Sequence, residues 1–169
     1  MSVWITTFCR QSVASVTPEQ LREGIAGRLQ ELSRVFCPDA KMSAELTIES
    51  TSTGTDFGTF LLRFSSGPPI EVERWHGDQT REEVADRLEL LEDETHPALV
   101  QIRNLLTAVQ ESIGFDLKVD QPEGMRWPVA LAAAAWFAEM GAGAILVDGY
   151  MSGWWLPKGK EVDWLVRED

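Results

Sequence analysis

The stretch WPVALAAAAWFAEM, residues 127–140, has apolar side chains at nearly every position. A helix on a protein surface is apolar along one stripe only, so a segment that is apolar all round predicts a helix buried on most sides. Its uninterrupted apolar part, residues 127–138, has 12 residues. That is well short of the roughly 20 residues needed to cross a bilayer. We therefore expect this helix to lie in the core of a folded domain.

The residues after this helix predict how it ends. Gly141-Ala142-Gly143 lies between the helix and an apolar run at residues 144–148, which predicts a short buried strand. Phosphate-binding glycine loops have the opposite order, because they follow a strand and open a helix. We therefore interpret these glycines as the C-terminal cap of the helix. Further on, residues 154–156 and 162–166 predict a hairpin.

The N-terminal half has the pattern of strands around one amphipathic helix. Residues 3–8 predict a first strand. Thr17 and Gln20 have the spacing of a capping box, and apolar residues at helical spacing then predict a helix as far as residue 36. An antiparallel meander is predicted over three further segments, residues 45–49, 57–64 and 70–75.

The middle of the chain is expected to be helical. Thr80 and Glu83 predict a second capping box, at the start of a helix. Pro97 begins another predicted helix that continues to residue 113 with Gly114 as its cap, and residues 115–119 then predict a strand. Taken together, these elements predict a single α+β domain over residues 1–169, with a mainly antiparallel sheet and about four helices packed on it.

The net charge of −12 restricts the partners of the chain. Nucleic acids and anionic membranes both require a basic surface, so we expect neither as a partner. The N-terminus lacks the basic and apolar regions of a signal peptide, and the two cysteines, Cys9 and Cys37, form no disulfide framework. These features predict a cytoplasmic protein with reduced thiols.

The negative charge is concentrated in the middle of the chain. Residues 78–124 contain 4 basic and 12 acidic residues, a net charge of −8. Four of the acids follow each other at spacings of 4, 3 and 4, which places them on one stripe of the predicted helix: Glu82, Asp86, Glu89 and Asp93. Such a stripe is typical of a solvated helix face, and it is also what a docking surface for a basic protein requires.

Tryptophan is unusually frequent, with seven residues. Trp154 and Trp155 are adjacent on a predicted strand, so their side chains should point to opposite faces, and one can be core while the other is exposed. With Tyr150 in the preceding turn, they have the composition of an interface anchor. Burial in the core is the alternative for each ring.

The sequence contains no set of residues typical of catalysis or metal binding. Its two histidines, His76 and His96, lie in no catalytic signature, and no complete ligand set surrounds either of them, so we predict no catalytic residue, metal or cofactor. A pocket near His76 and Asp78, or near Asp148 at the end of the buried strand, would instead indicate a small enzyme or a ligand-binding domain.

No stretch matches a family motif, so the functional hypothesis rests on charge and composition. The leading hypothesis is an acidic module that binds a basic protein partner by stoichiometric contact. An immunity-type or inhibitor protein that neutralises a toxin is one concrete form of it. A homo-oligomer with the Trp154–Trp155 hairpin at its interface is a further alternative.

Overall fold

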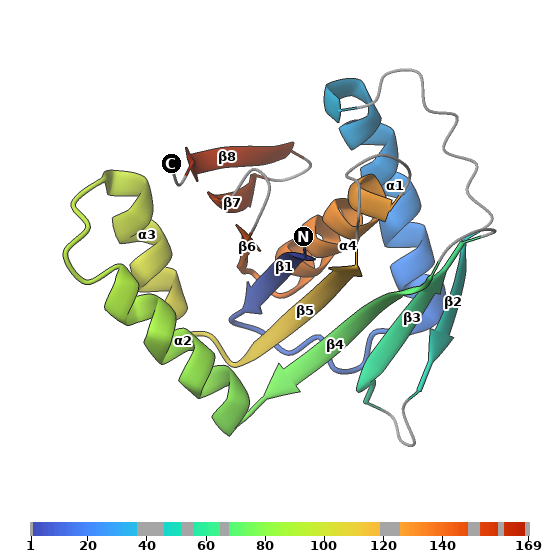
Figure 1. Ribbon diagram of the computed structural model, residues 1–169, viewed down its shortest axis with the longest axis horizontal. Coiled ribbons are helices and arrows are strands. Elements are labelled where there is room, and N and C mark those ends of the chain that lie inside the picture. The colour runs from blue at the N-terminus through green and yellow to red at the C-terminus, as the bar shows by residue number, and fades with distance from the viewer. Residues whose placement is uncertain are drawn as a thin grey trace.

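One antiparallel sheet of eight strands runs through the molecule, with helices on both of its faces (Figure 1). The computed structural model describes residues 2–36, 46–51, 56–64, 68–118, 126–148, 153–158 and 161–167. The strands are β1 (Ser2–Cys9), β2 (Thr47–Ser50), β3 (Thr59–Arg63), β4 (Ile70–His76), β5 (Glu111–Lys118), β6 (Ala144–Asp148), β7 (Gly153–Lys158) and β8 (Glu161–Arg167). The helices are α1 (Pro18–Phe36), α2 (Asp78–Leu90), α3 (Pro97–Leu106) and α4 (Arg126–Met140).

The order of the strands across the sheet is β2-β3-β4-β5-β1-β6-β7-β8. Every neighbouring pair is antiparallel, which confirms the predicted meander of β2, β3 and β4 and the predicted hairpin of β7 and β8. The first strand, β1, lies in the middle of the sheet between β5 and β6. The predicted α+β class is therefore confirmed, with four helices in the described part of the chain.

The first face of the sheet is covered by α1 and α4, which pack against each other. The apolar helix α4 lies over β1, β5 and β6, and every residue from Pro128 to Ala135 is buried, as its sequence predicts. The capping box of α1 also forms, because the backbone N–H of Gln20 donates to the Thr17 hydroxyl and the backbone N–H of Thr17 donates to Oε1 of Gln20.

The glycines after α4 form the predicted C-terminal cap. The N–H groups of Gly141 and Gly143 donate to the carbonyls of Phe137 and Ala138, each at 2.8 Å. Gly143 also lies so close to β1 that a β-carbon on it would be 1.8 Å from the Phe8 carbonyl oxygen. No other residue fits there, so the glycine sets how closely the end of α4 approaches β1.

The second face of the sheet is covered in part by α2 and α3. A separate apolar cluster forms there from Phe8, Leu146 and Trp154 on the sheet together with buried side chains of the two helices and the turn between them. These helical and turn residues are Leu91, Leu99, Ile102 and Leu106. The sheet is therefore buried on both faces near β1, β6 and β7. Toward its other end, α2 also contacts β4.

Two predictions in the middle of the chain are wrong. The third predicted helix ends at Leu106 and not at residue 113, because Ile113 belongs to β5, where Ile113, Phe115 and Leu117 alternate into the core. Thr80 caps no helix: α2 begins at Asp78 after Gly77, whose φ is 67°, and the Thr80 hydroxyl is hydrogen-bonded to Ser112 on β5.

None of the helices in the described ranges is both long enough and apolar enough to cross a membrane.

Candidate functional site

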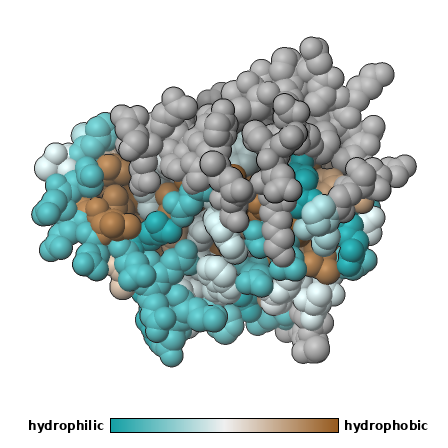
Figure 2. Space-filling model, viewed as in Figure 1, coloured by the Kyte–Doolittle hydropathy of each residue, from teal (hydrophilic) through white to brown (hydrophobic). Residues whose placement is uncertain are grey.

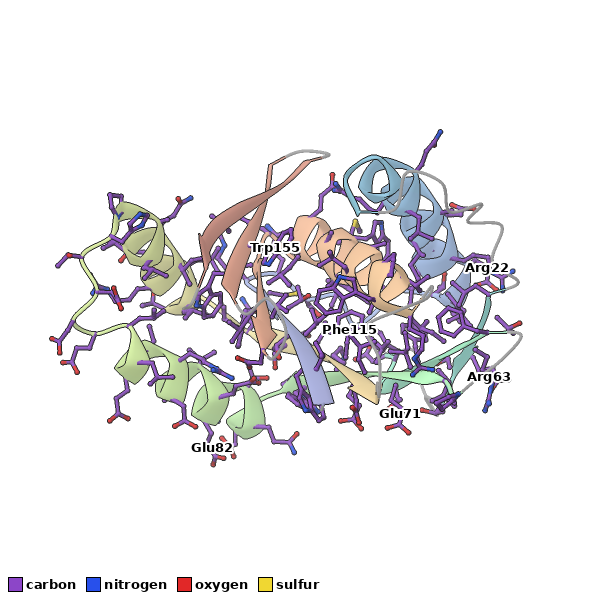
Figure 3. All side chains as sticks on the ribbon, turned by 45° about the horizontal axis from the view of Figure 1, so that its top comes forward. Arg22, Arg63, Glu71, Glu82, Phe115 and Trp155 are labelled. Atoms are coloured by element: carbon purple, nitrogen blue, oxygen red, sulfur yellow. The ribbon has the colours of Figure 1, made fainter. Side chains whose placement is uncertain are left out.

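The outer side of α2 carries the acidic residues that the sequence singled out. Glu82, Asp86 and Glu89 are all exposed, and they lie on the side of α2 opposite the buried or partly buried Thr80, Val84 and Leu88. Figure 3 shows the Glu82 side chain directed away from the body of the molecule. We call these three residues the acidic stripe.

Asp93 does not continue this stripe on the helix. The helix α2 ends at Leu90, so Asp93 lies in the following turn, where it is exposed together with Glu92 and Glu94. This turn is held in place by Arg103 of α3, whose Nη1 donates to the carbonyls of Leu91 and Glu92 at 3.1 and 2.9 Å. The prediction of four acids on one helix is therefore corrected to three on α2 and an adjoining acidic turn.

The charge of the acidic stripe is not neutralised by the basic residues of its own helix. Arg81 pairs with Asp78 at the start of α2, and Arg87 pairs with Asp148 of β6 at 2.9 Å. Within the described ranges, the three stripe carboxylates take part in no ion pair. Hydrophilic side chains cover this part of the surface, as Figure 2 shows over α2.

An exposed leucine interrupts this hydrophilic surface. Leu90, the last residue of α2, is 71% exposed and lies four residues after Asp86, one helical turn along the same side. An isolated apolar side chain on a surface is ordinary by itself. At the edge of an acidic stripe, however, it offers a partner an apolar contact next to the charges.

The two adjacent tryptophans are both buried, which is the core alternative for each ring. Trp154 and Trp155 are 1% and 4% exposed and point to opposite faces of the sheet, and each face carries a packed cluster at this position. Neither ring is on the surface of the chain. Tyr150, the third residue of the predicted anchor, lies outside the described residues.

The exposed tryptophan of the described chain is Trp4 on β1, with 41% of its surface accessible. Trp4 shares a face of β1 with Thr6 and Phe8, the face on which α2 and α3 lie. Phe8 is covered by the second apolar cluster, whereas Trp4 lies toward the other end of the strand. The alternation of β1 was visible in the sequence, but which end of this face is covered depends on the packing of α2.

A polar network attaches α2 to this face. The Thr80 and Ser112 hydroxyls are 3.3 Å apart, and the Ser112 hydroxyl is 3.4 Å from a carboxylate oxygen of Glu83. Burial raises the pKa of Glu83, and the nearby carboxylates of Asp148 and Asp86 raise it further, against the opposing effects of Arg87 and Ser112. Because the Ser112 side chain is fully buried, a substrate cannot reach it, and we assign the network a structural role.

The residues proposed for an alternative pocket lie on the surface. His76 and Asp78 are exposed, and Asp78 is paired with Arg81. His96 is the N-cap of α3, where its Nδ1 accepts from the Ala98 N–H at 3.2 Å. Asp148 is partly exposed and paired with Arg87. In the described segments, no three His, Cys, Asp or Glu side chains lie close enough together to hold a metal ion.

Comparison with known proteins identifies no relative: no family model matches the sequence, and neither a curated protein nor a solved structure matches it.

Proposed function

We propose that this chain is a binding protein that docks a basic protein partner on the acidic stripe of α2. The proposal is carried by one observation, the exposure of Glu82, Asp86 and Glu89 on one side of α2 without a basic partner in the described chain. Exposed charges of one sign increase the rate of encounter with an oppositely charged protein.

Two further features of the surface support docking at this place. The acidic turn after α2 is fixed by the hydrogen bonds of Arg103, so its charges extend the stripe from a defined position. Leu90 supplies an apolar contact at the border between the stripe and this turn. A rim of charge around an apolar contact is the usual composition of a protein interface.

An immunity-type or inhibitor protein that neutralises a basic toxin is the concrete form of this proposal. It would act in the cytoplasm. Its net charge of −12 disfavours a nucleic acid or an anionic membrane as its partner. No metal or cofactor is part of the proposed action. A homo-oligomer is the alternative that a measurement of solution mass addresses.

The test begins with site-specific photo-cross-linking in the native host. A photoreactive amino acid replaces Ala85, which is exposed on α2 beside the stripe, and in a matched control it replaces Ala26, which is exposed on α1. A docked partner should cross-link at position 85 and not at position 26. The captured protein is then purified, and its binding is measured directly.

The decisive measurement is the association rate of the purified partner. Glu82→Gln with Asp86→Asn should slow association about 10-fold at low ionic strength and leave dissociation nearly unchanged, because exposed charges act mainly on encounter. Glu19→Gln with Glu23→Gln removes the same charge from exposed positions on α1 and should have little effect. Equal rates for the two double variants would overturn the proposal.

A further inference from the structure

The contact between α2 and the sheet is largely polar. Thr80 is the buried residue of α2, at 1% exposure, and Val84 and Leu88 are only partly buried. The neighbouring helix α3 is shorter but buries three leucine or isoleucine side chains, and α4 is buried along most of its length. Because most helical stability in proteins comes from the packing of an apolar face, α2 is held less firmly than α3 and α4.

Hydrogen bonds and one ion pair make up much of this contact. The buried Thr80 hydroxyl is 3.3 Å from the Ser112 hydroxyl of β5, which is 3.4 Å from a carboxylate oxygen of Glu83. Farther along α2, Nη2 of Arg87 donates to Oδ2 of Asp148 at 2.9 Å. When a helix detaches, water replaces polar partners of this kind, so each of them contributes little net stability to the docked helix.

The two ends of α2 are held differently. Before the helix, Gly77 has a φ of 67°, and a β-carbon on it would meet nothing within 4 Å. After the helix, Leu91 is buried in the second apolar cluster, and Nη1 of Arg103 donates to the carbonyls of Leu91 and Glu92. The end of α2 is therefore anchored to α3, whereas its start is joined to β4 by a glycine with free space beside it. This is the arrangement of a hinged element.

Glu83 is the ionisable group at the centre of this contact. Its charged neighbours are Asp86 and Arg87 on its own helix and Asp148 on β6, and Arg87 is already paired with Asp148. Burial and the two acidic neighbours raise the pKa of Glu83, against the opposing effects of Arg87 and the Ser112 hydroxyl. The other elements that pack near α2 carry charged groups farther along the same face or bonded to the turn, namely Glu73 of β4, Asp116 of β5 and Arg103 of α3.

We infer that α2 is a pH-sensitive hinged helix, which pivots on its C-terminal turn and leaves the sheet more readily as the pH rises. Detachment places Glu83 in water, where its pKa returns to the ordinary carboxyl value of 4.5. The docked helix retains a proton that the detached helix loses, so docking is favoured below the ordinary pKa and weakens as the pH rises through the raised value. Since α2 carries the acidic stripe, this movement would regulate the proposed docking surface, and that consequence alone rests on the proposed function.

The test is native-state hydrogen exchange of the whole protein, followed by NMR and corrected for the intrinsic exchange rate at each pH. If α2 opens by itself, its amides should have protection factors at least about tenfold lower than those of α4, whose buried amides exchange on global unfolding. The opening constant of α2 should increase by up to about tenfold for each pH unit above 4.5, until the raised pKa of Glu83 is passed.

Two variants of adjacent residues assign the pH dependence. Glu83→Gln should keep the protection of α2 nearly constant over this range, whereas Glu82→Gln removes an exposed carboxylate and should retain the wild-type pH dependence. Equal protection of α2 and α4 in the wild type would show that α2 does not detach separately, and a pH dependence that survives in Glu83→Gln would exclude Glu83 as its origin. Either result overturns the inference. Neither of them bears on cross-linking at position 85 or on the association rate of a partner, so the proposed function stands or fails separately.

Discussion

Gly24 of α1 lies directly against the indole ring of Trp136 on α4, so closely that a β-carbon on residue 24 would be 2.5 Å from the ring. The two helices pack together over the first face of the sheet, and this contact is one of the points that set their separation. Gly27 is on the same helix, and a β-carbon there would meet nothing within 4 Å.

This pair of glycines gives a prediction with its own control. Gly24→Ala should lower the free energy of unfolding by about 1–3 kcal/mol, because either the ring or the helix must move. Gly27→Ala should raise it by up to about 1 kcal/mol, because alanine is the better helix former and its methyl group has room. Urea unfolding of both variants measures the difference. Similar stabilities would show that α1 and α4 do not meet at Trp136.

A buried ion pair on the first face predicts a large loss of stability. Nη1 of Arg74 lies 3.0 Å from Oε1 of Glu111, and both side chains are almost fully buried. Arg74→Met leaves the Glu111 carboxylate buried without its charge partner and should lower the free energy of unfolding by about 3–5 kcal/mol. Arg63 and Glu49 form an exposed pair on β3 and β2, so Arg63→Met should lower it by less than about 1 kcal/mol. Comparable losses in the two variants would contradict the burial of Arg74.

The elements that the sequence predicted correctly are those with a local pattern. The capping box of Thr17 and Gln20, the all-apolar α4 and the alternating strands of the meander need no information from distant residues. The boundary between α3 and β5 was wrong because Val109 and Ile113 continue the helical spacing of α3. Ile113, however, also begins the alternation of β5, and pairing with β1 and β4 on both sides favours the strand.

The candidate site also has features that follow from a local sequence pattern and features that depend on distant residues. The acidic stripe depends on spacing within one helix, so most of it was predictable, and only the end of α2 before Asp93 was missed. The position of Trp4 between Asp116 and Asp148 depends on the register of β1 with β5 and β6, which are more than a hundred residues away in the sequence. A period-two pattern fixes which face a side chain takes but not its cross-strand neighbours. The burial of Trp155 likewise required knowledge that α4 covers its face.

The thiol of Cys9 should be unreactive in the folded protein. Burial raises its pKa to about 12, and the nearby Glu111 carboxylate contributes in the same direction, so almost no thiolate forms at neutral pH. In a Cys37→Ala variant, a thiol reagent should label Cys9 only as fast as the protein unfolds, and denaturation should release one free thiol. Rapid labelling under native conditions would show that Cys9 is accessible. Cys37 lies outside the described residues, and its predicted reduced state is tested by counting two thiols in the denatured wild type.

Glu83 should make the stability depend on pH. Its pKa is raised in the folded state, mainly by burial, so the folded protein retains a proton that the unfolded chain has lost. The stabilisation from this proton is complete below the ordinary carboxyl pKa and is lost as the pH rises through the raised value. Glu83→Gln removes this titration and keeps a polar group near Ser112. The stability of wild type relative to Glu83→Gln, measured by urea unfolding, should therefore fall as the pH rises above the ordinary carboxyl pKa of 4.5. A difference that is constant with pH would contradict the burial of this carboxyl group.

The acidic stripe should reduce the stability of the protein that carries it. Glu82 and Asp86 are four residues apart on α2 and Asp86 and Glu89 are three apart, and like charges at these spacings destabilise a helix by about 0.2–0.5 kcal/mol per pair. Changing all three to Gln or Asn should raise the free energy of unfolding by several tenths of a kcal/mol at low ionic strength, by this estimate for two pairs. In 1 M salt, where the Debye length is about 3 Å, the gain should nearly disappear. Asp93→Asn is the control, since Asp93 lies in the turn beyond α2 and should change little. Urea unfolding at both salt concentrations measures these differences. If neutralising the stripe lowered the stability instead, its carboxylates would have a structural role and the proposed docking surface would lose its main support.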